Sequence, residues 1–283
     1  MRFEPLASSS HGNAYIVSDC RTRILLECGL AFRTLQKKCG FSLCEFDAVL
    51  VTHEHKDHAR CAGELARDGQ SVYMSAGTAL ALGLAEERPL SVVEMSWPED
   101  VAGTSDARPY CGERAAQIGA GRQINPETAV AVISAPNVTL VEHREQFRVG
   151  TFDVVPFSTY HDAAEPLGYL IRSRADGDVL VFATDTVNLR YRFPGLRLLA
   201  IEANYQESIL ERAGKLPEKT KDRIRNTHME IDTLCEIICN MDLSKCREIC
   251  LLHLSDAMSH EGQFINKVKR CVPPWVTVRA AAR

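Results

Sequence analysis

The sequence contains no apolar stretch that approaches the roughly 18–20 residues needed to cross a bilayer. Its first residues also lack the basic and apolar regions of a signal peptide, so we expect a cytoplasmic protein with no membrane partner. The eleven cysteines are odd in number, and the pairs Cys235/Cys239 and Cys246/Cys250 are spaced i, i+4 rather than as CxxC. Reduced core thiols are therefore expected instead of a disulfide framework or a zinc knuckle.

An excess of positive charge is also missing. The chain has 33 Lys and Arg against 37 Asp and Glu, which gives a net charge of −4. Binding along a nucleic acid relies on Lys and Arg to neutralise successive phosphates, so this balance argues against a long nucleic-acid track. A small anionic substrate needs only a local positive site, which metal ions could supply. The 283 residues, 45% of them hydrophobic, fit one large globular domain.

The most informative motif of the chain packs metal-binding side chains into six residues, His53-Glu54-His55-Lys56-Asp57-His58. The apolar residues 49–51 before it predict a buried strand, and a loop that leaves a strand end can direct two imidazoles to one metal ion. Asp57 and His58 could then face a second ion. Imidazole and carboxylate suit zinc, and two ions about 3.5–4 Å apart can bind both oxygens of a phosphodiester displacement. The alternative is a charged surface turn, but nine histidines seldom place three within six positions.

Strand and helix patterns alternate along the chain. Strands are predicted at residues 2–6, 14–17, 23–26, 49–51, 138–141, 152–157, 167–171, 179–183, 198–201 and 249–252. Helices are predicted at residues 32–39, 63–67, 77–85, 206–212, 218–225, 230–241 and 261–270. Residues 97–136 show poor apolar periodicity and are interpreted as an insertion that forms a lid, an interface arm or a loop. Two strand-rich halves that each close with helices predict two sheets packed face to face in one domain, residues 1–283.

Three later strands each lead to a histidine or an aspartate. Residues 152–157 lead to His161, residues 179–183 to Asp185, and residues 249–252 to His253. Side chains at strand ends are held by a rigid scaffold and yet open to a cleft, as a metal site requires. A lone histidine in such a place is often structural, but the order behind the first motif favours ligands. Two ions could share the seven residues, with Asp185 between them and a hydroxide as the nucleophile.

This arrangement resembles the metallo-β-lactamase superfamily over nearly the whole chain. The resemblance implies an α/β fold, the αβ/βα four-layer sandwich of two mixed sheets flanked by helices. It also implies two divalent metal ions at the sheet edges, with Zn²⁺ expected and Mn²⁺ as the alternative. One ion would be held by His53, His55 and His161, the other by Asp57, His58 and His253, and Asp185 would bridge the two.

One segment departs from the pattern of that family. The predicted strand at residues 23–26 ends in Glu27-Cys28-Gly29, where the family usually has Asp-x-Gly. Glu27 keeps a carboxylate, so it could still support a ligand histidine from behind.

The segment Arg223 to Met229 resembles the place where the phosphodiesterase branch, tRNase Z and its relatives, carries a His-Ser-Thr or His-Leu-Ser triplet. We place this segment at the start of a helix. His228 would then be a general acid for the leaving oxygen, and together with Asp57 it is the expected catalytic pair. Arg225, or Arg223, could bind a phosphate oxygen. The alternative for His228 is a water-exposed helix residue.

Several stretches are similar to the YycJ/WalJ-like subgroup, namely residues 6–13, 161–168, 201–205 and 252–255. That subgroup includes bacterial DNA exonuclease-like proteins and phage-type anti-Pycsar enzymes, which hydrolyse cyclic mononucleotides. Residues 191–196 and 242–245 are more similar to the phage type. The resemblance therefore implies a phosphodiesterase for 3′,5′-cyclic mononucleotides, and Asn204 and Tyr205, which follow a strand end, could line its nucleotide pocket.

Two other activities remain open, a 5′–3′ DNA exonuclease and a glyoxalase-type thiolesterase or lactonase. Nucleic acid is thus a possible partner in place of a small nucleotide. Enzymes of this kind are often dimers, so a homodimer is expected, with residues 97–136 as a possible interface arm.

Overall fold

Two β-sheets form the centre of the molecule in the computed structural model, which describes residues 1–89, 108–109, 129–214 and 216–281. The first sheet has the strand order β1-β2-β3-β4-β5-β9, and the second has the order β10-β11-β12-β13-β14-β15-β16. The first consists of β1 (Arg2–Ala7), β2 (Ala14–Ser18), β3 (Arg23–Leu26), β4 (Ala48–Leu50), β5 (Val72–Met74) and β9 (Val138–Leu140). The second consists of β10 (Phe147–Val149), β11 (Phe152–Ser158), β12 (Leu167–Ser173), β13 (Val179–Ala183), β14 (Leu198–Glu202), β15 (Glu248–Leu252) and β16 (Thr277–Ala280).

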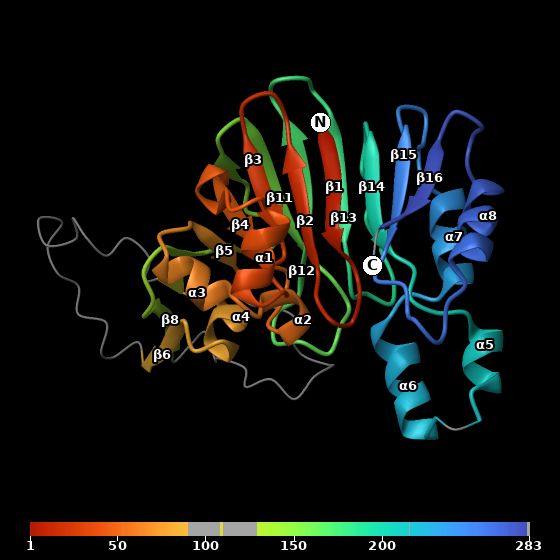
Figure 1. The fold of residues 1–283 in the computed structure, drawn as a ribbon, viewed down its shortest axis with the longest axis horizontal. Coiled ribbons are helices and arrows are strands. Elements are labelled where there is room, and N and C mark those ends of the chain that lie inside the picture. Colours follow the sequence, from red (N-terminus) through yellow and green to blue (C-terminus); the bar gives the residue numbers. More distant parts are fainter. Residues whose placement is uncertain (90–107, 110–128, 215, 282–283) are drawn as a thin grey trace, which may run out of the picture.

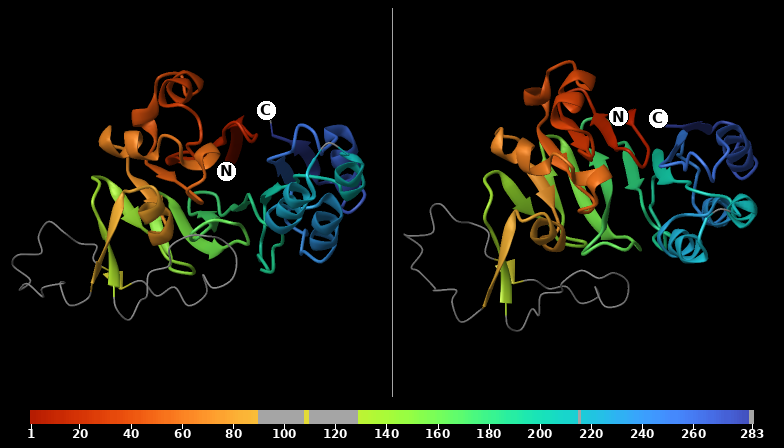
Figure 2. Two further views of the ribbon diagram at one scale, coloured as in Figure 1. Left: turned by 90° about the horizontal axis from the view of Figure 1, so that it is seen from below. Right: turned by 60° about the horizontal axis from the view of Figure 1, so that its bottom comes forward.

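Helices lie outside the paired sheets, those of the first half on one side and those of the second half on the other (Figures 1 and 2). The first group consists of α1 (Phe32–Lys38), the 3₁₀ helix η1 (Leu43–Glu45), α2 (Lys56–Ala59), α3 (Ala62–Arg67) and α4 (Ala76–Ala81). The second consists of α5 (Glu207–Arg212), α6 (Glu218–Thr227), α7 (Ile231–Cys239) and α8 (Glu261–Lys269). Within the described ranges, no helix combines the length and the apolar character needed to cross a membrane.

The central strands are apolar on both faces because each sheet is covered on both sides. In β3, Ile24 and Leu26 pack between the two sheets, whereas Leu25 packs against the helices of the first half. In β13, Phe182 lies between the sheets and Val181 packs with the outer cluster that includes α7 and α8. Strands that are buried on both faces have continuous runs of apolar residues, so these strands could be predicted from the sequence.

The predicted four-layer α/β sandwich is confirmed, although several elements differ. The helix predicted at residues 77–85 is wrong at its end, since α4 stops at Ala81 and Ala85 begins strand β6 (Ala85–Pro89). Strand β6 pairs with β8 (Ala129–Ile133), which also pairs with β7 (Arg108–Pro109) in a small third sheet. That sheet and the short strands β5, β10 and β16 were not predicted. Residues 97–136 lie largely outside the described ranges, so their role and the single domain stay predictions.

At one end of the sandwich, Asp19 joins the two sheets. Its carboxylate accepts hydrogen bonds from the backbone N–H groups of Arg21 and Thr22, both at 2.8 Å, in the turn between β2 and β3. It also accepts from the hydroxyls of Thr151 at 2.6 Å and Ser173 at 2.8 Å, which belong to the second sheet and its turns. Partial burial opposes the charge, but these donors lower the pKa of Asp19 to about 2.

We expect Asp19→Asn to destabilise the chain by about 1–2 kcal/mol at pH 7, because the native carboxylate has a lower pKa than the unfolded one. This contribution is complete above the unfolded pKa near 4 and is lost as the pH falls toward about 2. Urea unfolding of EDTA-treated protein between pH 7 and pH 3 measures it. Asp68→Asn, an exposed carboxylate at the end of α3, is the control. A difference between wild type and Asp19→Asn that does not shrink at pH 3 would contradict the assignment.

Candidate metal centre

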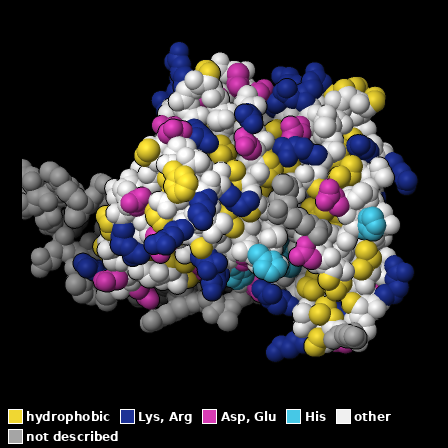
Figure 3. Space-filling view, viewed as in Figure 1, with side chains coloured by type: hydrophobic (Ala, Val, Ile, Leu, Met, Phe, Trp, Pro, Cys, Tyr) yellow, Lys and Arg dark blue, Asp and Glu magenta, His cyan; other side chains and the backbone are white. Residues whose placement is uncertain are grey.

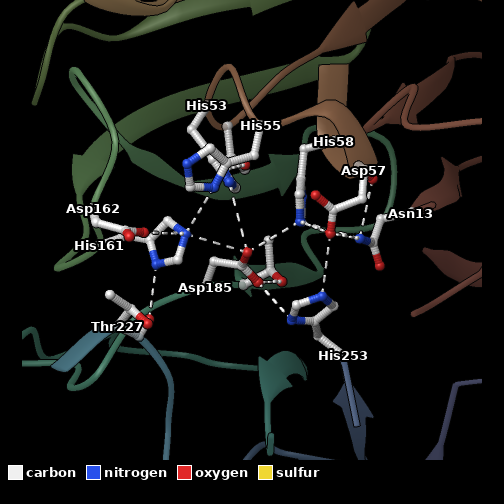
Figure 4. Close-up of polar contacts among 12 residues, drawn as sticks. Asn13, His53, His55, Asp57, His58, His161, Asp162, Asp185, Thr227 and His253 are labelled. Atoms are coloured by element: carbon white, nitrogen blue, oxygen red, sulfur yellow. Dashed lines mark hydrogen bonds and ion pairs between the residues drawn. The ribbon is translucent and has the colours of Figure 1, made fainter. Parts of the chain in front are cut away.

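Four strand ends bring the seven predicted ligands to one place. Strand β4 precedes His53, His55, Asp57 and His58, strand β11 precedes His161, strand β13 precedes Asp185, and strand β15 precedes His253. Strands β13, β14 and β15 are parallel, so the residues that follow them meet at the same edge of the sheet. In the first sheet, β4 is parallel to its neighbours β3 and β5 and points the opening motif at the same edge. Figure 4 shows the seven side chains pointing toward one another.

Asp185 lies at the centre of this group. Its Oδ2 atom is 3.1 Å from Nε2 of His58, 3.5 Å from Nε2 of His161 and 3.6 Å from Nε2 of His53. Its Oδ1 atom is 2.8 Å from Nδ1 of His253. One carboxylate therefore faces imidazoles from both halves of the chain, as expected of a residue shared by two cations.

Among the described residues, the possible ligand atoms fall into three overlapping groups that share Asp185, and two of these groups contain the seven predicted ligands. The atoms of each group lie within 4.8 Å of one another. The first group is His53, His55, His161 and Asp185, and the second is Asp57, His58, Asp185 and His253. The third group is Asp185, Glu202, His228 and His253. The first two groups have the composition that the resemblance implied, and metal binding by them stays a prediction. Histidine side chains reach the surface near the lower centre of Figure 3, with acidic and basic side chains around them.

The state of the buried nitrogen atoms suits a divalent cation. Nε2 of His53 and Nε2 of His253 are buried and have no hydrogen-bond partner among the described residues. A buried polar atom without a partner costs free energy, and a bound cation would remove that cost. Imidazole nitrogen and carboxylate oxygen together are typical zinc ligands, so the residues fit divalent metal ions.

A second layer of contacts fixes the orientation of the imidazole rings. His161 donates from Nδ1 to the carbonyl of Thr227 at 2.8 Å, which leaves its Nε2 for the centre. Nδ1 of His53 lies 2.8 Å from the hydroxyl of Thr52. Partners of this kind set the ring orientation and the tautomer of metal-binding histidines.

The fully buried Glu27 lies behind His58, as its place in the sequence suggested. Its Oε2 atom is 3.6 Å from Nδ1 of His58. Burial raises the pKa of Glu27. Burial also opposes a charge on His58, but the carboxylates of Asp185, Asp57 and Glu27 outweigh it and raise the pKa of that histidine. A ring of acidic groups around the imidazoles is the charge pattern that favours cations.

Three residues of the site have left-handed backbone conformations although they are not glycine. The φ angles are 65° for Glu27, 47° for Asp185 and 51° for His253. Each residue directly follows a strand or lies two positions beyond it. Side chains seldom adopt this region, and such conformations gather at functional sites where the surrounding structure holds them. The chain turns sharply here and directs these side chains to the centre.

His228 lies beside ligands of the first two groups, but at a different point of the helix than predicted. It follows the last residue of α6, so the prediction that its segment starts a helix is wrong. Its ring centroid is 5.3 Å from that of His161 and 5.5 Å from that of His253. Nδ1 of His228 is 2.6 Å from Oε1 of the fully buried Glu202. Burial opposes a charge on His228, but the carboxylate of Glu202 raises its pKa.

The other predicted substrate residues have structural contacts. The amide of Asn204 donates to the carbonyl of His253 at 2.9 Å. Tyr205 is 4% exposed, and burial raises its pKa to about 12. Arg225 contacts Glu207 at 2.6 Å and Asp222 at 3.2 Å. These three roles in substrate binding therefore stay predictions, and only Asn204 contacts one of the seven predicted ligands.

Asn13 and Glu202 also contact the site, and the sequence analysis gave neither of them a role. Asn13 donates from Nδ2 toward Nε2 of His58 at 3.1 Å and toward Oδ2 of Asp57 at 3.4 Å. Glu202 accepts from the backbone N–H of Thr186 at 2.8 Å in addition to its contact with His228. Glu202 is the last residue of the apolar strand β14. The pattern that predicted Asp185 and His253, an apolar strand that leads to a possible ligand, could therefore have indicated Glu202 too. Asn13 lies in a polar loop, and this pattern alone does not predict a contact with the metal centre.

A family model described as the metallo-beta-lactamase superfamily matches residues 9–220. The chain belongs to the metallo-β-lactamase superfamily. Exodeoxyribonuclease WalJ of Streptococcus pneumoniae is 25% identical over 264 residues, which cover 90% of this chain and 81% of WalJ. Exodeoxyribonuclease YycJ of Bacillus anthracis is 24% identical and covers 90% of this chain and 83% of its own length.

The fold is shared more widely than these sequences. Zn²⁺-bound PqqB of Methylobacterium extorquens has a TM-score of 0.63 at 14% identity, over 100% of this chain and 99% of PqqB. The family match confirms the predicted metallo-β-lactamase superfamily and fold class, and together with the similarity to WalJ it confirms that the chain is a hydrolase. Divalent metals are used by this fold, and the His and Asp groups of the chain fit that use.

We expect Asp185→Asn to weaken binding at both metal positions, because one carboxylate faces both ligand groups. His55→Ala should weaken only the first position. After dialysis against a fixed zinc concentration, mass spectrometry should find about two ions per wild-type chain, about one in His55→Ala and fewer than one in Asp185→Asn. Asp68→Asn serves as the control. Two ions retained by Asp185→Asn would rule out a shared carboxylate.

Proposed function

We propose that this chain is a dinuclear-metal phosphodiesterase of nucleotides, with 3′,5′-cyclic mononucleotides as the favoured substrate. The observation that carries the proposal is the placement of His228 and Glu202 beside the seven candidate ligands. The thiolate that leaves a thiolester needs no acid, whereas a ribose oxygen that leaves a phosphodiester does. A glyoxalase-type thiolesterase would therefore leave this pair unused, whereas a lactonase, which also expels an alkoxide, would not.

The seven residues His53, His55, Asp57, His58, His161, Asp185 and His253 would hold two divalent ions. Such ions would supply Lewis acidity for the phosphate and lower the pKa of water toward neutrality. Zinc is the proposed metal and manganese the alternative, and the similarity of the fold to that of Zn²⁺-bound PqqB supports zinc.

The proposed role of His228 follows from which of its nitrogen atoms is free. Nδ1 faces Glu202, so Nε2 is the atom that can give a proton to the leaving oxygen. Glu202 would orient the ring, as it also accepts from the N–H of Met229 at 3.3 Å. Asp57 would act through the second ligand group, where its Oδ2 lies 3.3 Å from Nε2 of His58 and 3.4 Å from Nε2 of His253.

The charges around the site support a small substrate. Arg223 is paired with Asp162 at 2.7 Å and Arg225 with Glu207 at 2.6 Å, so both arginines of α6 already have carboxylate partners. A polymer backbone would need several cations free to meet successive phosphates. The net charge of −4 points the same way.

A DNA exonuclease is the second candidate, and the similarity to the exodeoxyribonucleases WalJ and YycJ supports it. The similarity to each of these two proteins covers 90% of this chain. The same metal centre and the same acid would serve either substrate, since both contain a nucleotide phosphodiester.

The proposed homodimer, which rests on the resemblance, is tested by light scattering of the purified chain.

We expect His228→Ala to lower kcat on a cyclic mononucleotide by about 10²–10⁴-fold, the usual contribution of a general acid. Hydrolysis of bis(p-nitrophenyl) phosphate should fall much less, because p-nitrophenolate leaves without a proton. Metal content should not change. His260→Ala, an exposed histidine before α8, is the control. Equal losses on the two substrates would show that His228 is not the acid.

The substrate itself is decided by assaying the zinc- or manganese-loaded chain on 3′,5′-cyclic mononucleotides and on single-stranded DNA, with Asp57→Ala as the blank. We expect metal-dependent conversion of the cyclic substrates and no release of nucleotides from DNA. Degradation of DNA alone, with binding that weakens steeply with salt, would instead establish the exonuclease.

A further inference from the structure

An exposed tyrosine and an arginine form a pair at the edge of the candidate metal centre. Tyr160 is 37% exposed, although its neighbours Thr159 and His161 are buried. The guanidinium carbon of Arg190 lies 5.3 Å from the centre of the Tyr160 ring. That distance is within the range of a cation–π contact, so the arginine covers part of one ring face.

The backbone holds Tyr160 next to two candidate ligands. Its N–H donates to the hydroxyl of Thr186 at 3.0 Å, and its carbonyl accepts from the N–H of Val187 at 3.1 Å. Thr186 directly follows Asp185, and Tyr160 directly precedes His161. The backbone of Tyr160 is therefore held beside two candidate ligands and does not belong to a free loop.

Arg190 differs from the arginines of α6 in its charge balance. Arg223 and Arg225 have carboxylate partners, as described above. Arg190 is exposed, and within the described part of the chain it has no ion pair. Its charge is thus available to an anion that approaches Tyr160.

We propose that Tyr160 and Arg190 bind the nucleoside end of the substrate, with the base stacked on the Tyr160 ring and the phosphate near Arg190. This inference rests on the proposed function and names the part of the substrate that the chain recognises. Aromatic side chains bind bases of any kind by stacking, and an adjacent arginine adds charge toward the phosphate. The pair takes the place that the sequence analysis gave to Tyr205, whose ring is buried.

The test measures binding of adenosine 5′-monophosphate and of ribose 5′-phosphate to the zinc-loaded chain by calorimetry. We expect wild type to prefer the ligand with the base, and Tyr160→Ala to reduce that preference about tenfold or more, since stacking on an aromatic ring has this size. Tyr160→Phe should keep the preference. Arg190→Ala should weaken both ligands to a similar extent.

Phe41→Ala, at an aromatic residue that is 71% exposed after α1, is the control and should change nothing. Equal affinity of wild type for the two ligands, or an unchanged preference in Tyr160→Ala, would overturn the inference.

Kinetics separate this inference from the proposed function. In Tyr160→Ala the KM for a cyclic mononucleotide should rise about tenfold while kcat stays within about twofold. If wild type hydrolyses no phosphodiester and yet binds adenosine 5′-monophosphate through Tyr160, the proposed function fails and the inference stands.

Discussion

The structure depends on one carboxylate placed where the ends of both sheets meet. His58 follows strand β4 of the first sheet, and His253 follows strand β15 of the second. Asp185 faces both residues because the two sheets end at a common edge. The apolar residues between the sheets hold that edge together. The metal centre is therefore a property of the sandwich as a whole, and no single segment contains it.

Bringing five imidazoles and several carboxylates together in a buried place is costly unless each is paired. The structure offsets part of this cost with a surrounding layer of partners, in which Glu27 lies behind His58 and Glu202 contacts both His228 and His253. Glu202 links the metal centre to the proposed acid, because one carboxylate touches a candidate ligand and His228. The left-handed backbone conformations of Asp185 and His253 also cost free energy at this edge.

The sequence was most informative where chemistry and burial coincide. The ligands after β4, β11, β13 and β15 were predictable because apolar strands lead directly to His or Asp. Strand β5 has three residues, as β4 and β9 have, but Ser75 follows it directly, whereas Val51 and Val141 extend the other two apolar runs. The place of β5 depends on its pairing with β4 and β9. The Ala- and Leu-rich residues before Ala85 favour a helix locally, while pairing with β8 makes a strand. The contact between Asn13 and His58 could not be predicted, because only the fold brings these distant residues together.

The central claim is that two cations share Asp185. Anomalous diffraction at the zinc absorption edge from crystals grown with zinc tests it most directly. The account predicts two peaks about 3.5–4 Å apart, one on each side of the Asp185 carboxylate. A single peak on one group of ligands, or two peaks with Asp185 bound to neither or to only one, would contradict it.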